Sequence, residues 1–219
     1  MADFDGDGRP DLLSGSHCCD SYGFHVFRRT ADGWAPRRDL KVSDASKHAV
    51  AGFMQRSAVA AADWNGDGAP DLLWRTRRGI GVALGPFPEG KPLDVAHELA
   101  FTPRPTAEDE SLAEMTVADW DADGRPDLLA RLWLDGGRGG ILWYRNLGGP
   151  GLTRLAPGEL LLGAAALTGP TPRTRYVQGW CAGDWDGDGR PDLIVTRDDL
   201  TSLDANGRWV GSAWVYRRE

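Results

Sequence analysis

The sequence contains no run of eighteen apolar residues, so no segment is predicted to cross a membrane as a helix. Its N-terminus also lacks the charged and apolar regions of a signal peptide, so an exported protein would be represented here as a mature chain or a fragment. Cysteine is scarce, with Cys18, Cys19 and Cys181 among 219 residues, and an odd number leaves at least one thiol unpaired in a monomer. We expect Cys18 and Cys19 to be ordinary thiols, because a disulfide between adjacent cysteines closes a strained ring.

Basic residues are also outnumbered by acidic residues, 25 to 32. The formal net charge is −7, which argues against a nucleic-acid backbone as the main partner. The nucleophile-elbow, phosphate-loop and dinucleotide-binding motifs of common enzymes are absent. The four histidines show no metal-ligand spacing, and they are His17, His25, His48 and His97. His17, Cys18 and Asp20 fall too close together in the chain to form a catalytic triad, so no catalytic residue is nominated.

What the sequence does contain is a twelve-residue stretch in four copies. The copies read ADFDGDGRPDLL from Ala2, ADWNGDGAPDLL from Ala62, ADWDADGRPDLL from Ala118 and GDWDGDGRPDLI from Gly183. Their first aspartates are separated by 60, 56 and 65 residues. The intervals contain no long segments of helical period. The chain is therefore predicted to be one domain, residues 1–219, built from approximate repeats 1–56, 57–112, 113–175 and 176–219.

The residues between the copies have the composition of β-strands. Small apolar stretches precede three of the loops, as in SAVAAADW from Ser57, and apolar residues such as Leu72-Leu73-Trp74 follow every loop. A third element is rich in aromatic and β-branched residues, and it reads GFHVFRR, GIGVAL, GILWYRN and SAWVYRRE in the four repeats. A weaker fourth strand reads RRDLKV, AHELAF and GELLLG in the first three repeats. Four-stranded antiparallel units at this spacing predict an all-β fold, a β-propeller with four blades present.

The alternating aspartates predict metal-binding loops. Positions 1, 3, 5 and 9 of each copy bring side-chain oxygens toward one point, while glycine at position 6 permits the backbone to turn. The predicted ligands are Asp3, Asp5, Asp7 and Asp11; Asp63, Asn65, Asp67 and Asp71; Asp119, Asp121, Asp123 and Asp127; and Asp184, Asp186, Asp188 and Asp192.

Up to four Ca²⁺ ions are the expected cofactors, because Mg²⁺ rarely has an all-protein cage and Zn²⁺ prefers His or Cys. Four divalent cations would change the formal charge from −7 to +1 and relieve the repulsion within the loops. An EF-hand is excluded, because position 12 carries no glutamate and strands follow the loops. Position 2 is always aromatic (Phe4, Trp64, Trp120 and Trp185), and we expect these rings to pack between blades; a sugar-stacking row is the alternative.

These loops resemble those of the VCBS/FG-GAP repeat family, which includes the integrin α-subunit propellers. The resemblance covers the whole chain. It implies a calcium-binding β-propeller, and a secreted, periplasmic or cell-surface location. Such propellers usually have more blades, the first loop here lacks a preceding strand, and the last repeat ends after its third strand. We therefore expect a fragment or partial propeller. The alternatives are self-association of two chains into one ring, and a small propeller whose two ends complete a shared blade.

The resemblance implies a non-catalytic binding or scaffold module for carbohydrate or protein. The alternative is the propeller domain of a polysaccharide lyase or hydrolase. Binding specificity is expected in the connections that vary most between repeats, which begin at Lys41, Phe101 and Leu167. The sequence identifies no ligand.

Overall fold

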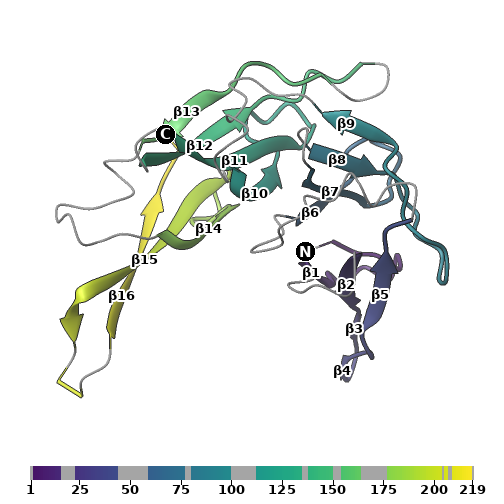
Figure 1. Ribbon diagram of the computed structural model, residues 1–219, viewed down its shortest axis with the longest axis horizontal. Coiled ribbons are helices and arrows are strands. Elements are labelled where there is room, and N and C mark those ends of the chain that lie inside the picture. The colour runs from purple at the N-terminus through teal and green to yellow at the C-terminus, as the bar shows by residue number, and fades with distance from the viewer. Residues whose placement is uncertain are drawn as a thin grey trace.

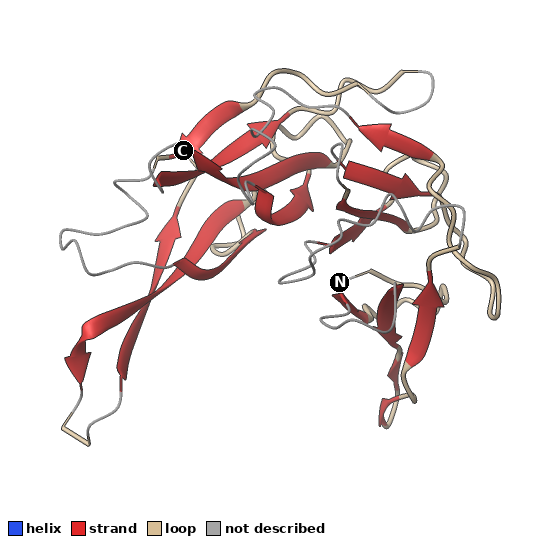
Figure 2. Cartoon of the chain, viewed as in Figure 1, coloured by secondary structure: helices blue, strands red, loops and turns tan. Residues whose placement is uncertain are grey.

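A computed structural model describes residues 2–15, 23–43, 59–76, 80–99, 112–134, 138–149, 154–163, 177–203, 205–206 and 209–218. These residues form strands and loops, and no helix occurs among them (Figure 2). Accordingly, nothing in these ranges is a helix with the length and apolar character of a membrane span. The all-β prediction is confirmed.

The strands form antiparallel sheets whose members follow chain order. The first sheet consists of β1 (Leu12–Gly15), β2 (Gly23–Phe27) and β5 (Arg38–Lys41), with a small hairpin of β3 (Arg29–Thr30) and β4 (Gly33–Trp34) beside it. The second consists of β6 (Val59–Ala62), β7 (Asp71–Arg75), β8 (Ile80–Ala83) and β9 (His97–Leu99).

The third sheet repeats the second. It consists of β10 (Leu112–Ala118), β11 (Asp127–Leu134), β12 (Arg138–Tyr144) and β13 (Glu159–Leu162). The fourth has three strands, β14 (Val177–Gly183), β15 (Asp192–Leu203) and β16 (Trp209–Tyr216). The strands expected from the sequence are therefore present, in sheets of three and four.

The four main sheets follow one another around an open arc (Figure 1). The strands that precede the acidic loops lie on its inner side, where β6 contacts both β1 and β10, and β10 contacts β14. Small side chains fit this crowded edge, and β6 has the sequence VAAA. Each sheet thus packs face to face with the next.

The core lies between consecutive sheets because alternate residues of a strand point to opposite faces. After the second acidic loop, Leu72 packs toward the first sheet and Leu73 toward the third. After the third loop, Leu128 packs toward the second sheet and Leu129 toward the fourth. These four leucines are fully buried. The inner sheets therefore have two buried faces, which explains their continuous apolar runs.

The aromatic residue at position 2 of each loop also contributes to the core between consecutive sheets. Trp64 and Trp120 are buried in the clusters that join the second sheet to the third and the third to the fourth, and Phe4 packs between the first and second. Trp185, on the outer face of the fourth sheet, is 61% exposed. The packing role holds for the three interior positions, whereas Trp185 has no neighbouring sheet among the described residues.

Candidate metal-binding loops

The aspartate at position 1 organises each acidic loop through backbone hydrogen bonds. In the first loop, Asp3 Oδ1 accepts from the amides of Gly6 at 2.8 Å and Asp7 at 3.2 Å, and its Oδ2 accepts from Gly8 at 2.7 Å. The same pattern recurs at Asp63 and Asp184, and at Asp119 with two of the three donors. Donation by the Gly8 amide is the main cause that lowers the pKa of Asp3, so this carboxylate favours its charged form.

The aspartate at position 9 connects each loop to the end of β2, β8, β12 or β16, the strand that pairs with the one after the loop. One oxygen of Asp127 accepts from the amide of Trp120 at 3.2 Å, and the other accepts from the amide of Asn146 at 2.7 Å. The equivalent aspartates make the same two bonds, and all four are at most 2% exposed (Asp11, Asp71, Asp127 and Asp192). Burial raises the pKa of Asp71 and Asp127, against the lowering effect of these donors.

Three of the loops bring carboxylate oxygens from positions 1, 3 and 9 together. Within each group these oxygens lie within 4.8 Å of one another, and the groups are Asp3, Asp5 and Asp11; Asp119, Asp121 and Asp127; and Asp184, Asp186 and Asp192. Position 5 stands apart from these groups. Its Oδ1 accepts the amide of position 7, as in Asp123 with Arg125 at 3.0 Å.

The second loop differs at position 3. There the Nδ2 group of Asn65 donates to Asp67 at 2.8 Å, while its Oδ1 accepts the amide of Asp67. The amide of Ala69 donates to Asp67 as well and is the main cause that lowers its pKa. The second loop therefore holds its position-5 carboxylate by uncharged donors and carries one negative charge fewer.

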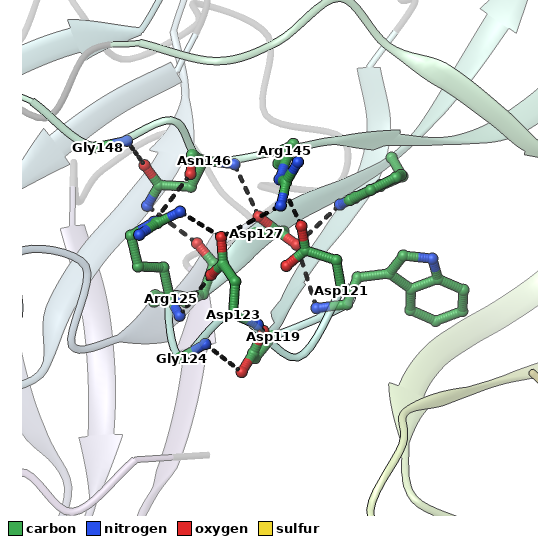
Figure 3. A network of polar contacts seen from close by, with 12 residues as sticks. Asp119, Asp121, Asp123, Gly124, Arg125, Asp127, Arg145, Asn146 and Gly148 are labelled. Carbon is green, nitrogen blue, oxygen red and sulfur yellow. Dashed lines mark hydrogen bonds and ion pairs between the residues drawn. The ribbon is translucent and has the colours of Figure 1, made fainter.

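The third loop provides a test of whether a cation fits (Figure 3). Asp121 Oδ1 is buried and has no hydrogen-bond partner, although Asp119 and Asp127 lie beside it. A buried carboxylate oxygen without a donor is costly unless a cation satisfies it. An all-oxygen donor set suits a hard divalent ion such as Ca²⁺. The residues present thus fit the ion that the sequence predicts.

Two left-handed backbone positions shape every loop. Position 6 is glycine with φ between 82° and 89°, as expected from the sequence. Position 4 is also left-handed, a feature that the sequence reasoning missed; it is glycine in three loops and Ala122, with φ of 61°, in the third. The repeated DGDG pattern carried this signal, because an alternating glycine is needed only where the backbone turns at both positions.

A cleft of about 610 Å³ separates the second and third acidic loops. Asp63 and Asn65 line one side, and Arg125 and Leu147 line the other. Leu147 is 42% exposed, so its apolar side chain is accessible to a ligand in the cleft. The cleft combines amide, carboxylate and guanidinium groups with one apolar surface, a composition suited to a polar ligand with an apolar face.

Several predicted features lie outside the described residues. These include His17, His48, Cys18 and Cys19, together with most of the variable connections that begin at Lys41, Phe101 and Leu167. Of the other histidines, His25 pairs with Asp39 at 2.9 Å on the first sheet, and His97 lies in β9. Cys181 is a free and exposed thiol.

Comparison with known families agrees with this geometry. The model of the FG-GAP-like repeat matches residues 3–74 and 119–195, which together include positions 1 to 9 of all four acidic loops. The chain belongs to the FG-GAP-like repeat family. The resemblance inferred from the loops is thereby confirmed. No curated protein matches this FG-GAP repeat chain.

Among solved structures, the FG-GAP repeat chain is similar to an Agrocybe aegerita lectin, described as specifically recognising non-reducing terminal N-acetylglucosamine. The TM-score is 0.52 at 18% sequence identity, and the match covers 99% of this chain and 56% of the lectin. The likeness supports a common fold. The chain spans just over half the length of that lectin.

Proposed function

We propose that this chain is part of a calcium-stabilised β-propeller that acts as a non-catalytic, extracytoplasmic binding module for carbohydrate. The propeller arrangement is supported by consecutive antiparallel sheets around an arc, with the strands before the loops on the inner side. It is further supported by the repeated junctions, in which the position-2 aromatic residue packs against the next sheet.

Calcium binding rests on the convergence of oxygens from positions 1, 3 and 9, and this observation carries the proposal. Asp119, Asp121 and Asp127 would hold the ion in the third loop, and the equivalent residues would hold it elsewhere. When bound, Ca²⁺ would supply positive charge that offsets the mutual repulsion of the carboxylates. The chain's contribution is the rigid turn that holds these oxygens together without metal.

Thermal unfolding with excess Ca²⁺, with Mg²⁺ and with chelator tests this binding. If only the folded state binds, Ca²⁺ at about 100 times its Kd adds about 2.7 kcal/mol per site. We therefore expect the Tm to rise by at least about 5 °C in Ca²⁺ and by less in Mg²⁺. An unchanged Tm, together with no heat of binding in calorimetric titration, would overturn the calcium proposal.

An extracytoplasmic location is part of the same proposal. Extracellular calcium modules bind their ion with Kd values of about 10⁻⁴ to 10⁻³ M, and such sites fill only where Ca²⁺ is abundant. The titration gives this constant directly. A submicromolar Kd at every site would favour an intracellular calcium buffer instead.

Carbohydrate binding is supported by the cleft between the second and third loops and by the fold shared with a lectin. N-acetylglucosamine is the first probe, followed by a glycan array in Ca²⁺ and in chelator. We expect Leu147→Asp to abolish binding, while Leu160→Asp, on an exposed residue of β13 that does not line the cleft, should preserve it. Equal binding by both variants would place the carbohydrate elsewhere, and a blank array would overturn the carbohydrate proposal.

A further inference from the structure

The residue that follows β2, β8, β12 or β16 occupies an equivalent place in all four sheets. In each sheet the last residue of that strand pairs with the residue after position 9, as Tyr144 pairs with Leu128. The next residue therefore lies beside the acidic loop. These four residues are Arg28, Leu84, Arg145 and Arg217.

Each of the three arginines pairs with the carboxylate at position 3 of its own loop. Arg28 Nη1 lies 3.3 Å from Asp5 Oδ2, and Arg217 Nε lies 3.6 Å from Asp186 Oδ2. Arg145 Nε pairs with Asp121 Oδ2, and its Nη2 lies 3.6 Å from Asp123 (Figure 3). The same contact thus recurs three times.

The second loop lacks both partners of this contact. Position 3 is Asn65 where the other loops have aspartate, and the strand-end residue is Leu84 where the other sheets have arginine. Leu84 instead packs against the core between the second and third sheets. The arginine is therefore present in each loop that has the extra carboxylate, and absent from the loop that lacks it.

Charge matching accounts for this pattern. The four oxygen-bearing side chains and the strand-end residue together carry a formal charge of −3 in all four loops. In the first, third and fourth loops one arginine offsets one of four carboxylates, and the second loop has three carboxylates and no arginine. Position 7 is a separate contribution: it is arginine in the same three loops, where Arg9 and Arg125 pair with position 5, and it is Ala69 in the second loop. The equality of charge therefore holds for the position-3 side chain and its strand-end partner, and not for the loop as a whole.

We propose that Arg28, Arg145 and Arg217 are positioning residues that neutralise the position-3 carboxylate when no cation is bound and lower the calcium affinity of their loops. The effect on affinity rests on the calcium binding proposed above, whereas the neutralisation does not. A guanidinium beside the loop competes for the carboxylate oxygen and repels a divalent ion.

The pair Arg145 and Asp121 offers a direct test, because two substitutions convert it to the residues of the second loop. We expect Arg145→Leu to lower the Tm in chelator by about 2 to 4 °C, because it leaves Asp121 uncompensated. Asp121→Asn should change the Tm by about 1 °C or less. The double variant should melt above Arg145→Leu alone. A double variant that melts no higher than Arg145→Leu would overturn the neutralising role.

Calorimetric titration with Ca²⁺ tests the second role separately. We expect Arg145→Leu to tighten one binding step about three- to tenfold, since it removes a positive charge near the ion. Lys91→Leu makes the same change in net charge at an exposed residue away from the loops, and should leave every step unchanged. An unchanged affinity in Arg145→Leu would overturn the effect on calcium. If the unaltered chain binds no Ca²⁺, the calcium proposal fails while the chelator experiment still decides the neutralising role.

Discussion

Asp127 accepts the backbone amide of Asn146 at 2.7 Å and so fixes the third acidic loop to the end of β12. Its second oxygen accepts from the amide of Trp120 and, at 2.9 Å, from the indole Nε1 of Trp143. One carboxylate thus satisfies three donors, one from the loop and two from β12 and the residues after it, while contributing to the candidate metal group. The same residue serves the fold and the site.

Asp127→Asn should therefore destabilise the chain even in chelator. The asparagine carbonyl can replace one acceptor, but its NH₂ group must then face an N–H donor in a fully buried place. We expect a loss of about 1 to 3 kcal/mol in the free energy of unfolding, measured by urea denaturation. Asp121→Asn is the matched control, and an equal loss in the two variants would show that Asp127 has no special structural role.

Much of this arrangement could be predicted from sequence. The fourfold repeat located the loops, and the composition of the intervening residues located the strands that flank them. The double role of position 9 could not be predicted. The motif shows an aspartate there, and an aspartate that binds a metal looks the same in sequence as one that accepts buried backbone amides. The arginines at the strand ends were visible in FRR, YRN and YRRE against GIGVAL, but their partners depend on register, which brings together residues 23, 24 and 31 positions apart.

His25 Nδ1 and Asp39 Oδ1 form a hydrogen bond of 2.9 Å on the first sheet that should make stability depend on pH. The hydrogen bond from His25 is the main cause that lowers the pKa of Asp39 below 3.8, and Arg37 lowers it further. A lowered pKa in the folded state means that this stabilisation is present above 3.8 and is lost as the pH falls through the lowered value. Asp39→Asn should thus lower the Tm slightly at about pH 6 and have no effect in strong acid. An equal difference in both conditions would contradict this assignment.

Trp120 and Trp185 occupy the same position of their loops but differ in exposure, at 7% and 61%. Trp120→Ala should remove packing between the third and fourth sheets and cost about 3 to 5 kcal/mol. Trp185→Ala should change the free energy of unfolding by about 0.5 kcal/mol or less. Urea denaturation of the two variants makes the comparison. A large loss in Trp185→Ala would mean that another sheet or another chain covers this tryptophan in solution.

Sequence could not distinguish these two tryptophans. Their local motifs are nearly identical, and burial depends on whether a neighbouring sheet packs against the residue. Leu12 shows the same effect at the other end of the arc, with 41% exposure where Leu72 and Leu128 are fully buried. Position within the array, rather than the motif, decides the environment of these side chains.

Among the residues that the structure describes, Ala122 is the one non-glycine residue with a positive φ, at 61°. It occupies a position that is glycine in the other three loops. A side chain in this conformation is strained by contact between its Cβ and the backbone. Ala122→Gly should relieve this strain and raise the free energy of unfolding by about 1 kcal/mol. The measurement is urea denaturation in chelator, so that no change in metal affinity contributes.

Two further substitutions separate strain from the general effect of glycine. Ala69→Gly makes the same change at position 7 of the second loop, where φ is not positive, and should destabilise by about 0.5 to 1 kcal/mol through the entropy of the unfolded chain. Gly124→Ala places a side chain at a φ of 86° and should destabilise by more than that. Opposite signs for Ala122→Gly and Ala69→Gly would establish that the third loop folds against a backbone preference. If both destabilise equally, the left-handed turn at position 4 carries no strain, and the glycine of the other loops has another cause.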